Sequence, residues 1–433
     1  QEPVRHLVTD SRTLADPEGA LFFAIKGDRN DGHRFVHGLA EKGVRHFVVS
    51  EFDDSFRNLK AGFVVVKDTL AALQRSAAFH RQRFSIPVIG ITGSNGKTIV
   101  KEWLYQLMRQ DKNIVRSPKS YNSQTGVPLS VWQMNASHDL AIFEAGISMK
   151  NEMERLQEII RPTTGILTNI GQAHAENFGG QEEMIHEKLK LFTSSETLIY
   201  CKDYLAVHEQ VSRAGFLPPS LKLFTWSRKA SANLQVGRVS RQGHETTIQG
   251  IYNNDFISIT IPFTDEASVE NAIHCWALML HLGYAHEVIS ERMALLSPVA
   301  MRLEMKDGIN NCSVINDSYN SDLGSLAIAL DFLNQQKQHD RRTLILSDIL
   351  QSGKDEEQLY SEVSRLIAGK GVSKLIGIGP SITRQAHRFS AEKTFFPSTE
   401  EFLKQFTARE FRDETVLLKG ARTFGFERIS NIL

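Results

Sequence analysis

The residues best suited to chemistry form one short segment, Gly93-Ser-Asn-Gly96-Lys97-Thr98. An apolar run over 86–92 precedes it and predicts a strand, and a helical pattern runs through 100–107 after it. Glycines let backbone N–H groups close around phosphate oxygens, and the start of a helix adds a favourable dipole. Lys97 can reach the β- and γ-phosphates, and the Thr98 hydroxyl can ligate Mg²⁺. The segment predicts a phosphate loop; the alternative is a tight turn from which Lys97 projects into solvent.

Two further polar side chains follow predicted strands. Glu144 comes directly after the apolar run 140–143, and His174 lies a few residues beyond the run 165–168. Ligand sites of open α/β sheets gather at the carboxyl ends of strands, so Glu144 is either a Mg²⁺ ligand or a solvated loop carboxylate. Because Mg²⁺ prefers oxygen ligands, the spacing of His174 by itself favours a structural or transition-metal role.

Lys188 occupies an unusual place in a predicted helix over 181–194. At 100° per residue the helix has an apolar stripe, and Lys188 falls in its middle while Lys190 lies on the polar side. The stripe consists of Met184, Ile185, Leu191 and Phe192. A lone ammonium there is costly unless it is paired or extends to the surface. Lys188 is therefore a candidate functional residue, and a lysine with a merely structural role is the alternative.

The arrangement of apolar runs predicts an α/β protein of three domains. Short alternating runs indicate a small α/β domain over 1–84, and apolar strands between helices indicate a mainly parallel sheet over 85–297. Within that second domain, 233–261 predicts hairpins with turns at Gly243 and Asn253-Asn254, followed by a helix at about 268–282. Renewed alternation predicts a Rossmann-like domain over 298–433.

Composition excludes several classes of protein. The 433 residues carry 50 Lys+Arg and 50 Asp+Glu, which gives no reason to expect nonspecific binding to nucleic acid or anionic membranes. The 3 cysteines are widely spaced, which argues against a disulfide framework and a cysteine-based zinc site. We find no apolar run of about 18 residues and no signal-like N-terminus, so we expect a cytoplasmic protein without membrane insertion.

Several blocks together resemble the Mur ligase family. The segment Thr92–Thr98 resembles the family's phosphate loop, which also departs from the strict P-loop pattern. The block 168–179 resembles its Thr-Asn…His…Phe-Gly block. Three shorter blocks follow in the family's order: Glu270-Asn271-Ala272, Met301-Arg302-Leu303-Glu304 and Asp317-Ser-Tyr319-Asn320-Ser321. The blocks cover nearly the whole chain, so coincidence is a poor explanation.

Finer details resemble the family members that add D-alanyl-D-alanine to UDP-N-acetylmuramoyl-tripeptide. The resemblance lies in two sequence blocks, Tyr121-Asn122 through Leu129 and Lys419-Gly420-Ala421-Arg422. The residues at the family's motif positions resemble those of the ligase half of a ligase–alanine racemase fusion. The resemblance implies a monomeric ligase of peptidoglycan synthesis that activates a carboxylate with ATP as an acyl phosphate. Alternatives are a third-residue-adding Mur ligase, a folylpolyglutamate synthase, or a nucleotide-binding regulator without ligase activity.

The resemblance also implies roles for individual residues. Lys97, Glu144, His174 and Lys188 would be catalytic, and Thr98, Glu144, His174 and a CO₂-derived carbamate on Lys188 would hold two Mg²⁺ ions. ATP would contact the loop from Gly93 through Ser94, Asn95 and Gly96 to Thr98, with Asn271 at adenine, Arg302 at phosphate and Asp317 at ribose or phosphate. The UDP-sugar would contact Ser11, Arg12, Lys26 and His33, and the substrates would also contact Asn122, Tyr319, Asn320 and Lys419.

Three features depart from the family pattern. The segment 347–353 differs from the usual Gly-Asp-Met-x-Glu-Leu-Gly, and Ser123 replaces the second Asn of the substrate block. Only nine residues precede Asp10, which leads us to expect a chain trimmed at its start.

Overall fold

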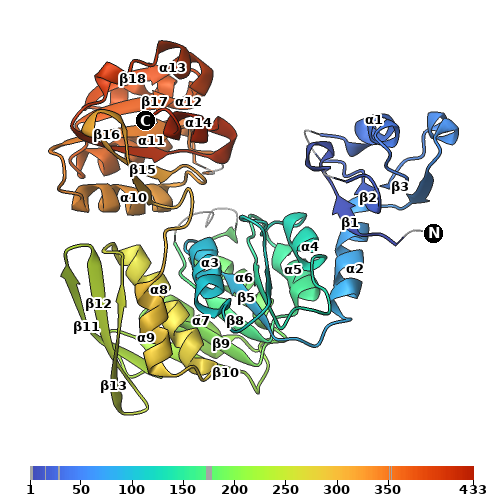
Figure 1. Ribbon diagram of the computed structural model, residues 1–433, viewed down its shortest axis with the longest axis horizontal. Helices are drawn as coiled ribbons and strands as arrows, with labels where there is room; N and C mark the ends of the chain where they lie inside the picture. Colours follow the sequence, from blue (N-terminus) through green and yellow to red (C-terminus); the bar gives the residue numbers. More distant parts are fainter. Residues whose placement is uncertain (1–2, 15, 28–29, 172–177, 351, 353) are drawn as a thin grey trace. The chain divides into compact units, whose positions relative to one another are not determined.

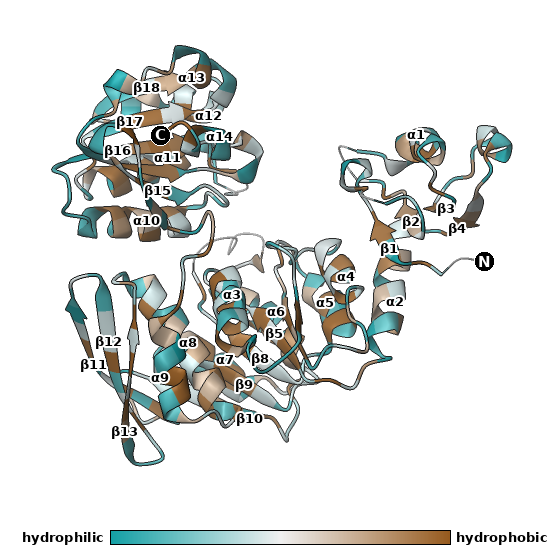
Figure 2. Ribbon diagram, in the orientation of Figure 1, coloured by the Kyte–Doolittle hydropathy of each residue, from teal (hydrophilic) through white to brown (hydrophobic). Residues whose placement is uncertain are grey.

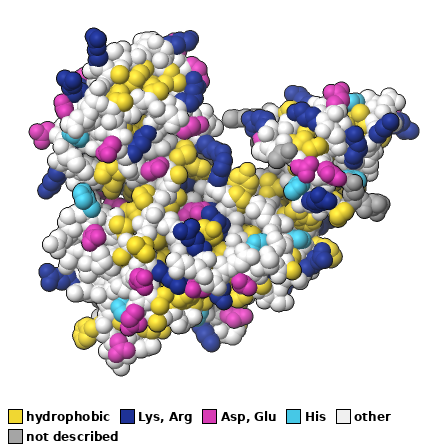
Figure 3. Space-filling model, in the orientation of Figure 1, with side chains coloured by type: hydrophobic (Ala, Val, Ile, Leu, Met, Phe, Trp, Pro, Cys, Tyr) yellow, Lys and Arg dark blue, Asp and Glu magenta, His cyan; other side chains and the backbone are white. Residues whose placement is uncertain are grey.

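The computed structural model describes residues 3–14, 16–27, 30–171, 178–350, 352 and 354–433. Its strands form three sheets of four, nine and six strands (Figure 1). The contacts group the chain into two compact units, which we describe separately: 1–93 with 104–168 and 185–225, and 94–103 with 169–184 and 226–433. Acidic and basic side chains are interspersed on the face drawn in Figure 3, as the balanced charge predicts. No described helix is long and apolar enough to cross a membrane.

The first sheet is small and parallel, with the strand order β1-β2-β3-β4. Its strands are β1 (His6–Val8), β2 (Ala20–Phe23), β3 (His46–Val49) and β4 (Gly62–Val65). Its helical segments are η1 (Ser11–Thr13), η2 (Gly32–Phe35), α1 (Val36–Glu41) and η3 (Asp54–Asn58). Phe22, Val36 and Phe47 lie in one buried cluster, so the short apolar runs form a core of their own.

Helix α2 (Thr69–Arg81) connects this sheet to the next and packs against α4 (Gly126–Val131) and α5 (Glu152–Ile160). The Arg81 guanidinium is buried and donates to the carbonyls of Ile160 at 2.9 Å, Phe84 at 2.6 Å and Arg161 at 3.3 Å. The first two lie at or near the ends of α5 (Glu152–Ile160) and α2. A cation near helix carbonyl ends is favourable, so Arg81 fixes the connecting helix in place.

The second sheet has the order β13-β12-β11-β10-β9-β8-β5-β7-β6. In the first unit β5 (Val88–Thr92) pairs in parallel with β7 (Leu140–Glu144) and β8 (Thr164–Leu167). The flanking strands are β6 (Ile114–Arg116) and β9 (Thr197–Cys201). The helices are α3 (Lys97–Met108), α4 (Gly126–Val131), α5, α6 (Gln181–Leu189), the short η5 (Lys190–Phe192) and α7 (Leu205–Arg213). Figure 2 shows hydrophobic residues along β5 and β8, as expected for strands covered on both faces.

The same sheet continues with β10 (Lys222–Ser227), β11 (Leu234–Gln242), β12 (Glu245–Tyr252) and β13 (Asp255–Ile261). The last three strands pair antiparallel, and Asn253 and Asn254 have positive φ between the second and third of them. This confirms the predicted hairpins and their turn residues. Helices α8 (Glu266–His281) and α9 (His286–Ala294) follow.

The third sheet has the order β14-β15-β19-β16-β17-β18, and only β14 runs antiparallel to its neighbour. The strands are β14 (Glu304–Asp307), β15 (Ser313–Asp317), β16 (Arg341–Ser347), β17 (Lys374–Ile378), β18 (Glu392–Phe396) and β19 (Glu414–Lys419). The helices are α10 (Leu323–Gln335), α11 (Glu356–Ala368), α12 (Pro380–Arg384), α13 (Thr399–Gln405) and α14 (Glu427–Ser430). Separate apolar clusters cover the two faces, which confirms a doubly wound sheet.

The predicted elements differ from the structure mainly in short strands. The sequence did not predict β1, β6, β9, β10, β14 or β18, and it placed Glu144 after a strand whose last residue it is. The helix predicted over 181–194 is shorter in the structure. Helix α6 ends at Leu189, and the 3₁₀ turn η5 follows it. The missed strands are as short as predicted strands such as β7 and β8, so pairing with neighbouring strands, and not length, makes them strands.

We predict that Gly165→Ala lowers the stability of the central sheet. A Cβ atom at Gly165 would lie 2.3 Å from the ring of Phe192, so the substitution overpacks a buried strand. Overpacking of this kind costs about 1–3 kcal/mol. The measurement is the midpoint of thermal unfolding, with Gly215→Ala as control because nothing lies within 4 Å of its Cβ position. Equal midpoints for the two variants would contradict the packing argument.

Candidate nucleotide-binding site

The glycine loop joins β5 to α3, as the sequence predicts. Gly93 and Gly96 have φ of 144° and 85°, a region that favours glycine. The Lys97 ammonium donates to the Ser94 carbonyl at 3.1 Å, so the side chain folds back over the loop and does not project into solvent. Ser94 Oγ is buried and has no hydrogen-bond partner among the described residues. A buried hydroxyl without a partner is costly, and a bound phosphate oxygen would supply one.

Asn169 fixes the conformation of this loop. Its backbone carbonyl accepts from the Ser94 amide at 2.7 Å, and its side-chain oxygen accepts from the Asn95 amide at 3.0 Å. Its side-chain amide also donates to Glu270 at 3.5 Å. Asn169 belongs to the family block 168–179, and the sequence predicted no role for it. Its position directly after the predicted strand 165–168 was the signal that could have identified it.

Asn271 packs directly against the loop. A Cβ atom on Gly96 would lie 2.2 Å from Asn271 Oδ1, so only glycine leaves room for that amide. The Asn271 side chain is buried, and α8 carries it next to Glu270. The structure therefore places one predicted ATP-binding residue beside the predicted phosphate loop.

Lys188 is buried, as its position in the apolar stripe predicts. Only 4% of the residue is exposed, and its ammonium donates to the Gly93 carbonyl at 3.3 Å. Lys190 contacts Glu154 at 2.8 Å and Glu187 at 2.9 Å. Partial burial opposes the charge of Lys190, but these two hydrogen-bonded carboxylates raise its pKa. Lys190 is therefore part of an ion-pair network and not the ordinary surface lysine that the sequence suggested, while Lys188 reaches the loop.

Glu144 is fully buried at the carboxyl end of β7. The Asn122 amide donates to its carboxylate at 3.5 Å, and the Glu144 backbone amide donates to the Ser117 hydroxyl at 3.2 Å. The structure thus brings together Glu144 and Asn122, which are far apart in the sequence. A solvated loop carboxylate, the alternative for Glu144, is excluded by its burial.

The predicted residues of the third sheet contact one another. The Lys419 ammonium and the Asp317 carboxylate form a buried ion pair of 2.7 Å between neighbouring strands. The Arg302 guanidinium carbon lies 4.4 Å from the centre of the Tyr319 ring, and the Asn320 amide donates to Asp322 at 2.8 Å.

The predicted sugar-nucleotide residues make local contacts. The Arg12 guanidinium donates to Asp10, and this hydrogen bond lowers the pKa of the Asp10 carboxyl. Ser11 begins the 3₁₀ turn that Asp10 caps, and Lys26 pairs with Glu51 at 3.0 Å on the surface. His33 Nε2 accepts from the Ser50 amide at 3.0 Å. Its Nδ1 must then carry the proton that faces Asp31 at 2.6 Å.

Two departures from the family pattern have structural explanations. Ser123 Oγ accepts from the Gly126 amide at 3.1 Å, so it supports the start of α4. In the segment 347–353, Asp348 accepts from the amides of Ser381 at 3.1 Å and Ile382 at 2.7 Å. Asp348 thus caps the first turn of α12. His174 lies outside the described residues.

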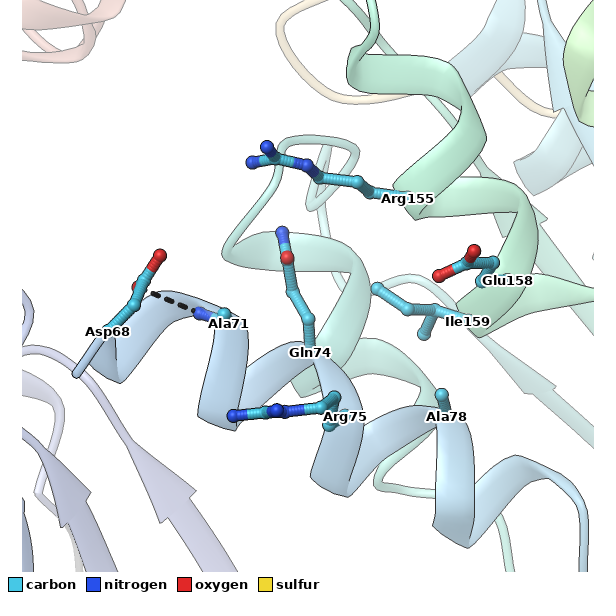
Figure 4. Close-up of a pocket in the computed structure, with 8 residues that line it drawn as sticks. All are labelled: Asp68, Ala71, Gln74, Arg75, Ala78, Arg155, Glu158 and Ile159. Carbon is cyan, nitrogen blue, oxygen red and sulfur yellow. Dashed lines mark hydrogen bonds between the residues drawn. The ribbon is translucent and has the colours of Figure 1, made fainter. Parts of the chain in front are cut away.

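A separate cleft of about 250 Å³ lies between α2 and α5 (Figure 4). Arg75 and Arg155 extend from the two helices at its mouth, and Asp68 beside it accepts from the Ala71 amide at 2.9 Å. The other lining residues are Gln74, Ala78, Glu158 and Ile159. No residue predicted for the site lines this cleft.

Three family models match consecutive parts of the chain. They are the Mur ligase family catalytic domain at residues 3–81, the Mur ligase middle domain at 91–279, and the Mur ligase glutamate ligase domain at 301–422. The chain belongs to the Mur ligase family.

Named relatives and solved structures agree with this family. UDP-N-acetylmuramoyl-tripeptide–D-alanyl-D-alanine ligase of Bacillus subtilis is 28% identical over 439 residues, covering 99% of this chain and 93% of the relative. Crystal structure I of MurF from Acinetobacter baumannii superposes with a TM-score of 0.82 at 22% identity, covering 99% of this chain and 93% of that one. MurF ligase from Thermotoga maritima, solved in complex with ADP, has a TM-score of 0.79 at 19% identity, with coverage of 99% and 97%. These two solved structures share the fold of this chain over almost its full length.

We predict that Gly96→Ala abolishes most nucleotide binding. The added methyl group would collide with Asn271 and would occupy a backbone conformation that alanine resists. Calorimetric titration with ATP and Mg²⁺ measures the effect, and we expect affinity to fall at least about tenfold, from the loss of roughly 1.4 kcal/mol. Gly243→Ala is the matched control, because its φ is also positive at 59° but nothing lies within 4 Å. Equal ATP affinity for the two variants would show that the glycine loop does not bind the nucleotide.

Proposed function

We propose that this chain is an ATP-dependent ligase that joins D-alanyl-D-alanine to UDP-N-acetylmuramoyl-tripeptide in peptidoglycan precursor synthesis. One observation carries the proposal: the glycine loop has a buried lysine, Lys188, at its first carbonyl and Asn271 packed on Gly96. The three Mur ligase models and the name of the Bacillus subtilis relative support the substrate assignment. We infer that the protein acts in the cytoplasm, as a monomer.

The loop fits a nucleotide triphosphate. Ser94 Oγ has no hydrogen-bond partner in the part of the chain that the structure describes. The Lys97 ammonium already lies over the loop, where phosphate oxygens would replace the Ser94 carbonyl. Thr98 follows at the start of α3, whose dipole favours an anion. We assign Asn271 to adenine, Arg302 to phosphate, and Asp317 to ribose or phosphate. The complex of the Thermotoga maritima protein with ADP supports a nucleotide as the ligand.

We assign two Mg²⁺ ions to Thr98, Glu144, His174 and a carbamate on Lys188. Glu144 fits this role because it is a buried carboxylate at the carboxyl end of a strand. A carbamate forms when the neutral Lys188 amine attacks CO₂ and releases a proton, and burial favours that neutral amine. Bound Mg²⁺ would neutralise the phosphate charge during transfer.

The reaction needs an activated carboxylate, because joining an acid to an amine in water is uphill. A terminal carboxylate oxygen of the tripeptide attacks the γ-phosphorus of ATP, and ADP leaves. The amine of D-alanyl-D-alanine then attacks the acyl carbon of the acyl phosphate. Phosphate leaves, and the new amide loses the proton of the former amine. Lys97 and Arg302 contribute positive charge and position the phosphates, which is the main requirement of phosphoryl transfer.

The substrate contacts rest on the family pattern. Ser11, Arg12, Lys26 and His33 are assigned to the UDP-sugar, and Asn122, Tyr319, Asn320 and Lys419 to the peptides. Arg12 and Lys26 are exposed and can exchange their carboxylate partners for a ligand. His33 is already held at both ring nitrogens, so it supports the loop around it more directly than it can bind a ligand.

The test of this proposal is phosphate release from ATP with UDP-N-acetylmuramoyl-tripeptide, with and without D-alanyl-D-alanine. We expect release to depend on both substrates and to match formation of the pentapeptide product by mass. Turnover of the UDP-muramoyl-dipeptide with a diamino acid would identify a third-residue ligase instead, and turnover of a folate with glutamate would identify a folylpolyglutamate synthase. Phosphate release that does not change when any acceptor is added would indicate a nucleotide-binding regulator.

We predict that Lys188→Ala reduces kcat by about 100-fold or more, because an anionic metal ligand worth several kcal/mol is lost. Short carboxylates such as acetate or propionate should restore part of the activity by occupying the vacated space. Lys190→Ala is the control, since it removes a neighbouring lysine whose partners are Glu154 and Glu187. Full activity of the Lys188 variant would refute the carbamate.

A further inference from the structure

The segment that carries Arg302 is a tight turn. The Arg302 amide donates to the Val299 carbonyl at 3.0 Å, which closes a turn of four residues. Met301, the second central residue of this turn, has a φ of 59°, whereas the φ of Ala300 before it is not positive. This pattern matches a type II turn, which ordinarily has glycine at the second central position. The chain therefore places a methionine where the backbone favours glycine.

The unfavourable backbone conformation continues on the other side of Arg302. Leu303 has a φ of 50°, so the arginine lies between two residues in the left-handed region, neither of which is glycine. A Cβ atom crowds the backbone in this region, and such conformations persist only where their surroundings hold them. The Leu303 side chain packs against the apolar cluster that contains Leu326 and Leu330 of α10, which holds one side of the turn.

Glu304 holds the other side. Its carboxylate oxygen Oε2 accepts a hydrogen bond from the Met301 amide at 3.0 Å. Glu304 is the first residue of β14, and this strand pairs with β15, so the carboxylate is anchored on the third sheet. Hydrogen bonds to an ionised acceptor are stronger than those between neutral groups. The carboxylate therefore holds the backbone of the turn directly beside Arg302.

We propose that Glu304 is a positioning residue for Arg302. By accepting from the Met301 amide it keeps the turn in its left-handed conformation, and the turn determines where the Arg302 guanidinium lies. The guanidinium carbon lies 4.4 Å from the centre of the Tyr319 ring, so the side chain extends from the turn toward the residues that follow β15. This inference rests on the proposed function, in which Arg302 contacts a phosphate of ATP.

The first experiment measures ATP–Mg²⁺ binding by calorimetric titration in the absence of the other substrates. We expect Glu304→Ala to weaken binding about tenfold, as for a misplaced charged contact to phosphate. Glu304→Asp should show a similar loss, because its carboxylate is withdrawn by one methylene from the Met301 amide. Glu304→Gln should bind within about twofold of the wild-type protein, because its amide oxygen still accepts a hydrogen bond. Glu291→Ala changes an exposed glutamate of α9 and is the matched control, with unchanged affinity.

A second set of variants tests the role of the backbone conformation. Glycine adopts a positive φ without steric cost, so Met301→Gly should make the turn independent of Glu304. The double variant Met301→Gly/Glu304→Ala should therefore regain most of the ATP affinity that Glu304→Ala loses. In an Arg302→Ala background, Glu304→Ala should cause no further loss, because the carboxylate acts through that arginine. The midpoints of thermal unfolding show whether each variant is folded.

Several results would overturn the inference. Glu304→Ala and Glu304→Asp could bind ATP as the wild-type protein does, or Met301→Gly could fail to restore affinity. Equal losses for Glu304→Gln and Glu304→Ala would show that the carboxylate contacts the nucleotide itself. Additive losses from Glu304→Ala and Arg302→Ala would show that the two residues act independently. A wild-type protein that does not bind ATP–Mg²⁺ would instead contradict the proposed function.

Discussion

Withdrawal of charged groups from water is the strongest constraint on the central sheet. Lys188 and Glu144 are both almost completely buried, and each would cost several kcal/mol without compensation. The Gly93 carbonyl accepts from Lys188 at 3.3 Å, and the Asn122 amide donates to Glu144 at 3.5 Å. Buried charged groups with specific polar partners cluster at functional sites, so the burial of Lys188 and Glu144 marks this end of the sheet as a candidate site.

The loop that faces the nucleotide is held by residues on other elements. Asn169 accepts from two loop amides, and Asn271 fills the space that a side chain at Gly96 would need. These two asparagines come from the end of β8 and from α8, so the loop has its shape before any ligand arrives. Preorganised dipoles of this kind do not have to rearrange during phosphoryl transfer.

The third sheet uses charge differently. Asp317 and Lys419 neutralise each other on adjacent strands, whereas Arg302 and Arg422 share the face of Tyr319. The ion pair links the two strands at their carboxyl ends, and the ring lies close to two guanidinium groups.

The sequence by itself determined the elements with strong local signals. The glycine loop, the apolar strands beside it, the buried Lys188 and the hairpin turns at Asn253-Asn254 each follow from residue type and period, and the structure has them all. Only the tertiary structure decided which distant residues meet. Three contacts illustrate this: Asn169 with the glycine loop, Asn122 with Glu144, and Arg422 with the Tyr319 ring. They join positions 22 to over 100 residues apart, and local propensity carries no information about such pairs. The short strands β1, β6, β9, β10, β14 and β18 were missed for a related reason, since pairing within a sheet and not periodicity makes them strands.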